Sequence, residues 1–370
     1  MGWTATPERL TKRGLNRALL ARQWLLGRVR RGVPAALEHL VGLQAQNTPS
    51  PYLALWSRLE GFRPEALSRL LSTRRAVRLA LHRSTIHLVT ARDCLALRPV
   101  LAPVLARAHA SSPFGKRLGA LDLAPLVAKA RALLEEGPLT TSELGARLAA
   151  LRPGADAEAL GYAMRALLPL VQVPPRGLWG EGGLPRCADA EAWLGRGLAT
   201  DASPDAFALR YLAAFGPATA ADFQAWSGLG GAAPLFARLR PRLRVLADER
   251  GRELFDVPRA PRPDPDAPAP PRLLPDYDNA FLAHADRARI VAAEDLPRMR
   301  AENTFLPPFL VDGFVAGTWK LERARERATL VLRPMRRLAA PDRAALEAEG
   351  EALLGLLAAD ARARDVRFAR

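Results

Sequence analysis

Two glutamines separated by one residue, Gln44 and Gln46, form the pair whose type and spacing could do chemistry. They lie between two apolar runs that have helical character. Thr48 and Ser50 each precede a proline, and a residue before proline is disfavoured in helical geometry. The sequence therefore predicts that a helix ends near Gln44 and that the chain then extends.

The spacing of the two glutamines matters because it depends on backbone conformation. In an extended segment, residues two apart point to the same side, whereas on a helix they do not face each other. Two amides could then converge on one small target. Each amide offers two N–H donors and a carbonyl acceptor but no charge, so it can position a group without being a strong base. The alternative is that both side chains simply face water or cap backbone groups at a helix end.

Length and composition limit the class of protein. The 370 residues suggest two to four domains, and 49% hydrophobic residues are ample for buried cores. No apolar run is long enough to span a membrane, and no secretion signal is apparent, so we expect a cytoplasmic protein. The two cysteines, Cys94 and Cys187, are far apart in the sequence. They and the five histidines lack metal-ligand spacing, so neither a disulfide framework nor a metal site is expected.

Familiar catalytic and nucleotide-binding motifs are missing from the sequence. There is no phosphate-binding loop of the G-x-x-x-x-G-K-[ST] type and no dinucleotide fingerprint of the G-x-G-x-x-G type. There is also no G-x-S-x-G nucleophile elbow. We therefore expect no cofactor.

The net charge of +16 is concentrated at one end of the chain. Residues 1–118 carry 20 Lys or Arg against 5 Asp or Glu, whereas the other 252 residues carry 34 against 33. A one-sided basic block indicates a polyanionic partner, most simply nucleic acid. A coding bias toward arginine is the alternative, because 50 of the 54 basic residues are Arg. Such a bias explains the choice of Arg over Lys but does not explain why the excess is local.

Helices followed by a short β-hairpin, the pattern of a winged helix, occur three times. Periodicity and turn residues divide this part of the chain into units at residues 1–118, 119–200 and 201–257. In the first unit, strands are predicted over 76–82 and 85–89. In the second, Thr140 and Glu143 have capping-box spacing, and strands are predicted over 171–173 and 178–180.

The remainder of the chain has a different character. Residues 258–272 are proline-rich and predict a semi-rigid linker. Residues 273–370 predict a small α+β domain with a closing helix over 341–365 and strands over 289–291, 309–311, 314–319 and 328–332. Asp312-Gly313 between apolar runs is a strong hairpin signal. The expected fold is therefore mainly α with short β-hairpins: three tandem winged helices plus a C-terminal α+β domain.

Several basic and polar side chains of the first unit are candidates for DNA contact. They are the arginine clusters and the first hairpin: Arg28, Arg30, Arg31, Arg74, Arg75, His82, Arg83, Thr85 and His87. The alternatives are solvated charge runs and a solvated wing with surface histidines. Trp24 and Trp56 are flanked by leucines and are expected in the core rather than stacked on bases.

Five stretches of the chain resemble the winged-helix DNA glycosylases of the AlkZ/YcaQ type. They are Leu43-Gln44-Ala45-Gln46, Pro51-Tyr52-Leu53-Ala54-Leu55-Trp56-Ser57-Arg58, Thr85-Ile86-His87-Leu88-Val89, Leu274-Pro275-Asp276-Tyr277-Asp278 and the run from Leu310 to Trp319. The stretches occur in order and span the chain. The resemblance is to the branch with a Gln-x-Gln pattern, whereas another branch has Gln-x-Asp.

The resemblance implies an activity and a site. It implies that Gln44 and Gln46 are catalytic, that the winged helices frame a basic concave surface, and that a hairpin meets the minor groove. The expected activity is monofunctional hydrolysis of the N-glycosidic bond of N7-alkylated guanines, bulky or crosslinked, in DNA repair and resistance to alkylating natural products. The expected partner is double-stranded DNA carrying alkylated or crosslinked purines, in the nucleoid, with the protein as a monomer.

Two other classes of function compete with the enzyme. One is a non-catalytic DNA-binding or regulatory protein built on the same winged helices. The other is an interaction scaffold without nucleic acid, which the basic block disfavours. An assay for abasic sites on alkylated DNA separates the enzyme from the regulator.

Overall fold

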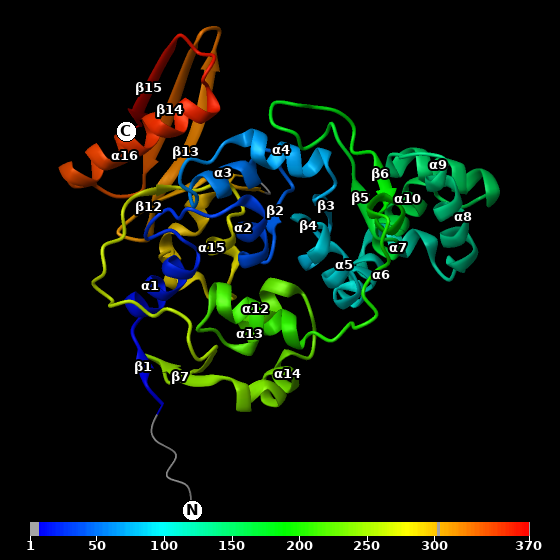
Figure 1. The fold of residues 1–370 in the computed structure, drawn as a ribbon, viewed down its shortest axis with the longest axis horizontal. Coiled ribbons are helices and arrows are strands. Elements are labelled where there is room, and N and C mark those ends of the chain that lie inside the picture. Colours follow the sequence, from blue (N-terminus) through cyan, green and yellow to red (C-terminus); the bar gives the residue numbers. More distant parts are fainter. Residues whose placement is uncertain (1–6, 302–303, 370) are drawn as a thin grey trace, which may run out of the picture.

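The computed structural model describes residues 7–301 and 304–369 and has a mixed α/β architecture (Figure 1). The group α8–α10 (residues 124–167) projects from one side of the body, strands β13–β15 with helix α16 (residues 314–368) project from another, and helices α12–α14 (residues 205–239) lie at a third edge. Strands β2, β3 and β4, which fall within residues 43–90, lie between these parts in this view.

The first unit has the predicted order of helices followed by a hairpin. Its elements are α1 (Lys12–Arg22), α2 (Val33–His39), β2 (Leu43–Gln44), α3 (Ser50–Trp56), α4 (Pro64–Ser72), β3 (Ala76–Ala80) and β4 (Ile86–Thr90). Helix α1 has 11 residues. It ends at Arg22, and Trp24 then has a positive φ of 55°.

The second unit contains elements that the sequence analysis missed as well as some that it predicted. It follows three helices that end the first unit, α5 (Ala91–Val100), α6 (Ala102–Ser111) and α7 (Pro113–Leu118). The elements of the second unit are α8 (Ala124–Glu135), α9 (Thr141–Leu151), α10 (Ala157–Leu167), β5 (Leu170–Gln172), β6 (Cys187–Asp189) and α11 (Ala190–Leu194). The capping box of Thr140 and Glu143 at the start of α9 is confirmed. The predicted strand over 178–180 is wrong, because this stretch is a loop in which Gly177 and Gly180 have positive φ.

The first two units share one β-sheet. The sheet has five strands in the order β2-β4-β3-β5-β6. Strand β3 pairs with β4 on one edge and with β5 on the other, with Arg78 opposite Gln172. A boundary at residue 118 therefore divides the chain between two strand groups that are hydrogen-bonded to each other. The wing of the first unit is an inner part of the sheet rather than a free hairpin.

The third unit packs against the N-terminus of the chain. Its elements are α12 (Asp205–Phe215), α13 (Ala220–Ser227), α14 (Ala232–Leu239), β7 (Arg244–Asp248) and β8 (Glu253–Asp256). The strands form the predicted hairpin, and β1 (Arg9–Leu10) adds to it in parallel with β7. Arg22 at the end of α1 donates to Asp256 at 2.7 and 2.9 Å, and both side chains are fully buried.

The C-terminal part is the predicted α+β unit with a different closing element. Its elements are β9 (Arg272–Leu273), α15 (Asn279–Leu282), β10 (Arg300–Ala301), β11 (Thr304–Phe305), β12 (Pro308–Val311), β13 (Phe314–Ala324), β14 (Arg327–Pro334), α16 (Ala340–Leu357) and β15 (Ala363–Phe368). The hairpin at Asp312-Gly313 is confirmed, and the sheet order is β15-β14-β13-β12-β9. The predicted strand over 289–291 is wrong, because a 3₁₀ turn occupies Arg287–Arg289. The closing helix ends at Leu357, and the chain then forms β15 parallel to β14.

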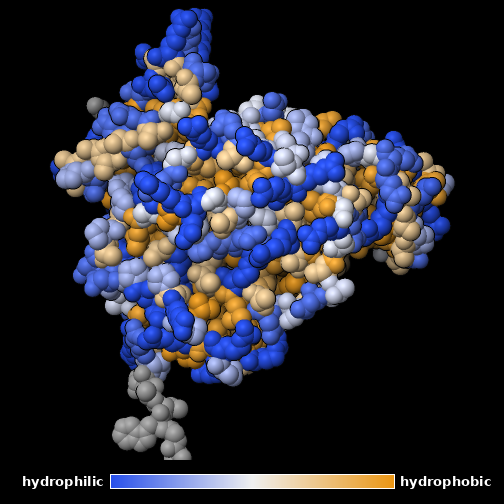
Figure 2. Space-filling view, in the orientation of Figure 1, coloured by the Kyte–Doolittle hydropathy of each residue, from blue (hydrophilic) through white to orange (hydrophobic). Residues whose placement is uncertain are grey.

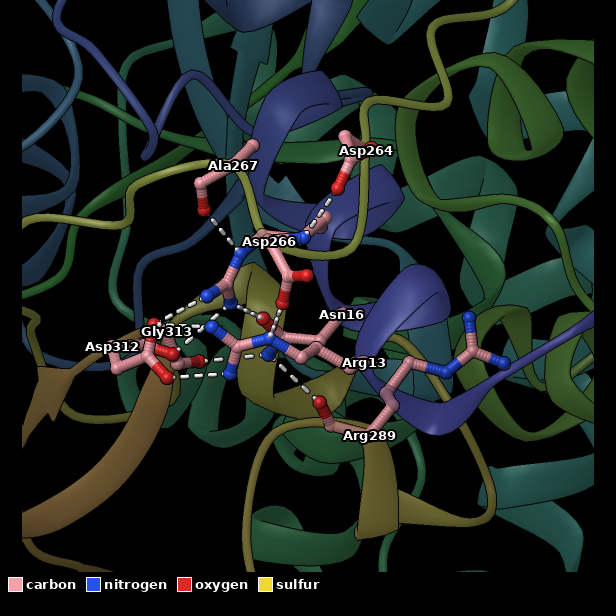
Figure 3. Close-up of polar contacts among 9 residues, drawn as sticks. Arg13, Asn16, Asp264, Asp266, Ala267, Arg289, Asp312 and Gly313 are labelled. Atoms are coloured by element: carbon pink, nitrogen blue, oxygen red, sulfur yellow. Dashed lines mark hydrogen bonds and ion pairs between the residues drawn. The ribbon is translucent and has the colours of Figure 1, made fainter.

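Helix α1 is bonded to the predicted linker and to the C-terminal part (Figure 3). Arg13 and Arg17 both form ion pairs with Asp312. Asn16 donates to the carbonyl oxygens of Arg289 at 2.9 Å and Gly313 at 2.8 Å, and Arg17 donates to that of Ala267 at 2.7 Å. Part of the N-terminal excess of positive charge is therefore used inside the protein.

The structure also bears on membranes and metals. None of the helices it describes combines the length and the apolar character needed to cross a bilayer. Across residues 7–301 and 304–369 there is no group of three or more His, Cys, Asp or Glu arranged to hold a metal ion.

Candidate active site

Gln44 lies at the end of strand β2, opposite His87 of β4. Its side chain is buried, and its carbonyl oxygen accepts a hydrogen bond of 2.9 Å from Nη2 of Arg83. A guanidinium can only donate, so the contact fixes which end of the amide faces Arg83. Nη1 of Arg83 donates to the carbonyl oxygen of Trp226 and so ties this group to helix α13.

Gln46 lies two residues further on and is exposed. Its carbonyl oxygen accepts a long hydrogen bond of 3.4 Å from the backbone N–H of Ile86. Ala45, between the two glutamines, is fully buried in the core and donates its N–H to Ile86 O. Both amides therefore lie against the turn between β3 and β4, one at Arg83 and the other at Ile86, as expected for an extended segment.

A segment far away in the sequence holds the chain around the two glutamines. The side chains of Asn47 and Ser50 both donate to the carboxylate of Asp276. Asn279 donates from Nδ2 to the carbonyl oxygens of Leu40 at 3.1 Å and Gly42 at 2.8 Å. The sequence analysis used this region only for its resemblance and assigned Asp276 and Asn279 no role. Their signal in the sequence is a polar run, Asp-Tyr-Asp-Asn, which begins three residues after the end of the buried strand β9.

The same segment carries a buried ion pair that joins it to helix α3. Arg58, just after α3, donates to both oxygens of Asp278 at 2.9 and 2.8 Å. Neither side chain is exposed to solvent. The pair is bidentate, which fixes the relative orientation of the two groups. The position of the segment after Leu274 relative to the first unit is thus defined by charge as well as by packing.

A polar cavity of about 220 Å³ lies beside Gln46. Its walls come from strands β3 and β5, helices α9 and α10 and the loop before β6: Gln46, Arg78, Ala80, Ile86, Thr141, Arg165, Leu170, Gln172, Arg176, Pro185 and Cys187. These residues include three arginines and no carboxylate. Gln44 is not one of them, and seven of the eleven belong to the second unit. The cavity beside Gln46 is therefore shared between the first and the second unit.

The first hairpin is not a solvated wing. His82 and His87 are only 1% and 2% exposed, and their rings lie 4.5 Å apart in an edge-to-face arrangement. His82 stacks on Phe207 and lies 4.4 Å from the ring of Trp226, both from the third unit. The expectation that both histidines lie at the surface or contact DNA is wrong for this arrangement, because other units of the chain cover them.

The remaining DNA-contact candidates divide by what they touch. Arg28 is bound to Glu349 at 2.7 Å and lies over Trp56, and Arg30 is bound to Glu60 at 2.6 Å. Thr85 is half-buried and donates to His82 O. Arg31, Arg74 and Arg75 are exposed and form no ion pair within the described part of the chain, although Arg74 lies over Trp193. Trp24 and Trp56 are half-buried against the core, close to the expectation.

One hairpin does project from the body of the protein. It is β13–β14, whose tip extends into solvent and is hydrophilic (Figures 1 and 2). Residues 323–327 at this tip are all exposed and include three arginines, of which Arg325 and Arg327 form no ion pair with any residue described. The hairpin that the resemblance places at the minor groove therefore has a structural candidate other than the first hairpin.

Burial of the two histidines gives a prediction about acid stability. Burial, and next the nearby Arg83 charge, lower the pKa of His87 from 6.5 to about 3. Between these values the unfolded chain binds a proton that the folded protein does not, so stability is complete above about pH 6.5 and falls as the pH falls. Each such histidine lowers the free energy of unfolding by up to about 1.4 kcal/mol for each unit by which the pH falls between these two values. The free energy of unfolding in urea, measured from pH 7.5 to 5, should fall less steeply with decreasing pH for His87→Gln than for the wild type. Equal pH dependence of the two proteins would contradict a neutral buried His87.

Comparison with known proteins agrees with this architecture. The structure matches the Streptomyces sahachiroi DNA glycosylase AlkZ with a TM-score of 0.76 and 21% sequence identity, over 98% of this chain and 100% of that one. At that identity the likeness shows a shared fold. A family model for DNA glycosylase AlkZ-like proteins matches residues 37–356. No match was found among curated protein sequences.

The class that these findings define is a DNA glycosylase, and DNA is the substrate of this class of enzyme. The chain belongs to the AlkZ-like DNA glycosylase family.

Proposed function

We propose that this glycosylase hydrolyses, without a lyase step, the N-glycosidic bond of guanine alkylated at N7, including bulky and crosslinked adducts. Gln44 and Gln46 are the proposed catalytic residues. The observation that carries the proposal is their placement on either side of buried Ala45, with both amides against the turn between β3 and β4. The reaction needs no metal, cofactor or second subunit. Its setting would be the repair of DNA damaged by alkylating natural products, in the cytoplasm where the nucleoid lies.

The chemistry of this leaving group suits amides. An N7-alkylated guanine is already cationic, so it departs without being protonated, and the sugar becomes oxocarbenium-like as in other glycoside hydrolysis. The enzyme then has to hold a water molecule beneath C1′ and orient it. Each amide oxygen has two lone pairs and uses one for Arg83 or for the Ile86 N–H. The second lone pair of each is available to accept a hydrogen from that water.

The surroundings supply no acid for an uncharged base. Among the residues that the structure describes, no carboxylate lines the cavity beside Gln46. His87 is held neutral by burial and by Arg83, and the pKa of His82 is likewise well below its ordinary value because of burial. Departure of an unmodified purine requires a proton donor at neutral pH. Unmodified guanine should therefore remain in the DNA. The exposure of Gln46 also suits a bulky lesion, which is hard to flip into a closed pocket.

An abasic-site assay tests the proposed function. Matched duplexes should carry N7-methylguanine, a nitrogen-mustard adduct or unmodified guanine at one position. We expect abasic sites in the first two and none in the third, with the strand left intact until treated with base. DNA binding without base release from any duplex would contradict the enzyme and favour a non-catalytic DNA-binding protein.

Arg83 should act as a positioning residue for Gln44. Arg83→Met removes the donor that holds the Gln44 oxygen, so single-turnover excision should fall by about tenfold or more, the scale of a lost hydrogen bond from a charged group. DNA affinity should change little, because Arg83 is bonded within the protein. Arg83→Lys should restore part of the rate. A loss of affinity with an unchanged rate would instead make Arg83 a DNA contact.

The β13–β14 hairpin should contribute to binding rather than to chemistry. Arg325→Gln and Arg327→Gln together should weaken duplex binding. The slope of log affinity against log salt should become shallower by the amount expected for about two lost phosphate contacts. The control is Arg238→Gln, which removes an arginine paired with Asp205 in the third unit. Excision by bound enzyme should be unchanged in the hairpin variant. An unaltered salt slope would exclude these arginines from the DNA contact.

A further inference from the structure

The arginines beside Gln46 are unusual because no carboxylate balances them. Arg78, Arg165 and Arg176 line one cavity, and none of them forms an ion pair with another residue in the described ranges. Glu143, at the start of α9, is bonded to Thr140 and to Arg186 instead. Three like charges around one space repel each other. Such a cluster is stabilised by an anion.

Arg78 is the clearest sign of an unfilled partner. It is 3% exposed, and its Nε and Nη1 atoms are buried with no hydrogen-bond acceptor among the described residues. The side chain still carries its charge at neutral pH, because burial lowers its pKa only to about 10. Buried polar groups nearly always have a partner, and a buried charge without one is costly.

Arg78 is also linked directly to the catalytic strand. Its Nη2 donates to the carbonyl oxygen of Ala45 at 2.7 Å, and Ala45 lies between the two glutamines. The half-buried Arg165 and Arg176 are each fixed by one backbone carbonyl, Ser84 O at 2.5 Å and Gly183 O at 2.9 Å. Arg78 and Arg165 are therefore fixed by the backbone between the two glutamines and by the turn against which these glutamines lie.

We propose that this cavity is a phosphate-binding subsite for the DNA backbone, and that it takes the phosphodiester next to the nucleotide whose glycosidic bond faces Gln46. The planar guanidinium group presents pairs of N–H donors, which can bind two oxygens of one phosphate through parallel hydrogen bonds. Because Gln46 itself lines the cavity, a phosphate bound there belongs to the strand whose sugar reaches the glutamines.

A phosphate in this cavity would remove a repulsion that the proposed reaction otherwise faces. This part of the inference rests on the proposed function. A sugar with oxocarbenium character next to uncompensated guanidiniums would be destabilised by repulsion. A phosphodiester bound between the sugar and the arginines places negative charge beside the developing cation. The arginines then stabilise the transition state indirectly, by fixing an anion of the substrate itself.

The experiment removes the charge of single arginines in the protein and, separately, the charge of single phosphates in the DNA. Arg165→Gln and Arg176→Gln are suitable because both side chains are half-exposed and their loss should not disrupt the core. Arg147→Gln is the matched control, because it also removes one arginine from the second unit but its side chain is exposed and paired with Glu136 at 3.2 Å outside the cavity. Thermal unfolding verifies that all three variants fold.

The first measurement is equilibrium binding to unmodified duplex over a range of salt. Arg165→Gln and Arg176→Gln should each make the slope of log affinity against log salt shallower by about 0.9, the value for one phosphate contact. Arg147→Gln should leave the slope unchanged. Equal slopes for all proteins would overturn the subsite. Competition by inorganic phosphate at constant ionic strength, without any change in the slope for DNA, would likewise overturn it in favour of a free-anion site.

The second measurement locates the phosphate. In lesion-containing duplexes, each phosphate near the lesion is replaced in turn by a neutral methylphosphonate. At one position beside the lesion, the replacement should weaken wild-type binding by about tenfold but have little further effect on Arg165→Gln or Arg176→Gln. If the methylphosphonate weakened binding of the arginine variants as much as binding of the wild type at every position tested, the assignment would be overturned. Because both measurements follow binding, a shifted salt slope without any base release would support the subsite while contradicting the proposed function.

Discussion

Replacing Gln46 with alanine is expected to lower single-turnover excision of an N7-alkylated guanine by about 10²–10³-fold, the cost of losing one preorganised polar group at a reacting centre. Gln46 is exposed, and its side chain makes a single, long hydrogen bond to the described part of the chain, so its loss should not disturb folding. DNA affinity should barely change, because phosphate contacts carry most of the affinity. The measurement is excision with enzyme in excess over DNA, accompanied by a binding titration.

Companion variants define what Gln46 does. Gln44→Ala should also lower the rate, and the double variant should lose less than the product of the two losses, since residues that hold one water act as a unit. Gln46→Asp should retain part of the activity, because a carboxylate can accept a hydrogen from the water and face the sugar cation. Wild-type rates for both alanine variants would leave the glutamines as polar surface and nothing more.

The second large effect is on stability. Asp278→Ala removes the partner of Arg58 and leaves a fully buried guanidinium, whose Nε already lacks an acceptor, without a counter-charge. Removing one member of a buried pair costs about 3–5 kcal/mol, so the free energy of unfolding in urea should fall by that amount. Asp266→Ala is the control, because Asp266 is 90% exposed where it pairs with Arg13.

The control variant should leave the free energy of unfolding nearly unchanged, since exposed pairs contribute little. Asp278→Ala should also slow excision at temperatures where it stays folded, because the segment that carries Asp278 also carries Asp276, which holds Asn47 and Ser50. Equal stability of the Asp278 variant and the wild type would contradict the role of the buried pair in holding this segment.

Local patterns in the sequence predicted local structure well. The capping box at Thr140, the hairpin at Asp312-Gly313 and the extended chain at Gln44 each depend on a few neighbouring residues whose preferred geometry the fold does not oppose. The family and the class of enzyme were also predicted, because the resembling stretches are themselves local. Convergence of the two glutamines on a common target remains a prediction that only function can test.

Long-range pairing explains most of what the sequence could not predict. Counted along the chain, the basic residues of the first 118 positions have too few acidic neighbours to pair with. Three of these arginines are nevertheless buried in ion pairs with aspartates more than 200 residues away: Arg17 with Asp312, Arg22 with Asp256 and Arg58 with Asp278. His87 looked like a wing residue because nothing in its own segment shows that the third unit covers the hairpin.

The cavity beside Gln46 depends on the same kind of pairing. Arg78 and Gln172 lie in different predicted units and become neighbours only because β3 pairs with β5. A boundary drawn at residue 118 separated the two halves of the cavity wall. The phosphate subsite is therefore a property of the shared sheet, and no stretch of sequence contains it.

The most direct test of the account compares the wild-type protein with the Gln44→Ala, Gln46→Ala double variant on one duplex that carries N7-methylguanine. Released base and abasic sites are measured in a single turnover with all DNA bound. The account predicts release of N7-methylguanine by the wild type and a rate at least about 10²-fold lower for the double variant, at similar affinity. Equal rates for the two proteins, or no release by the wild type, would contradict it.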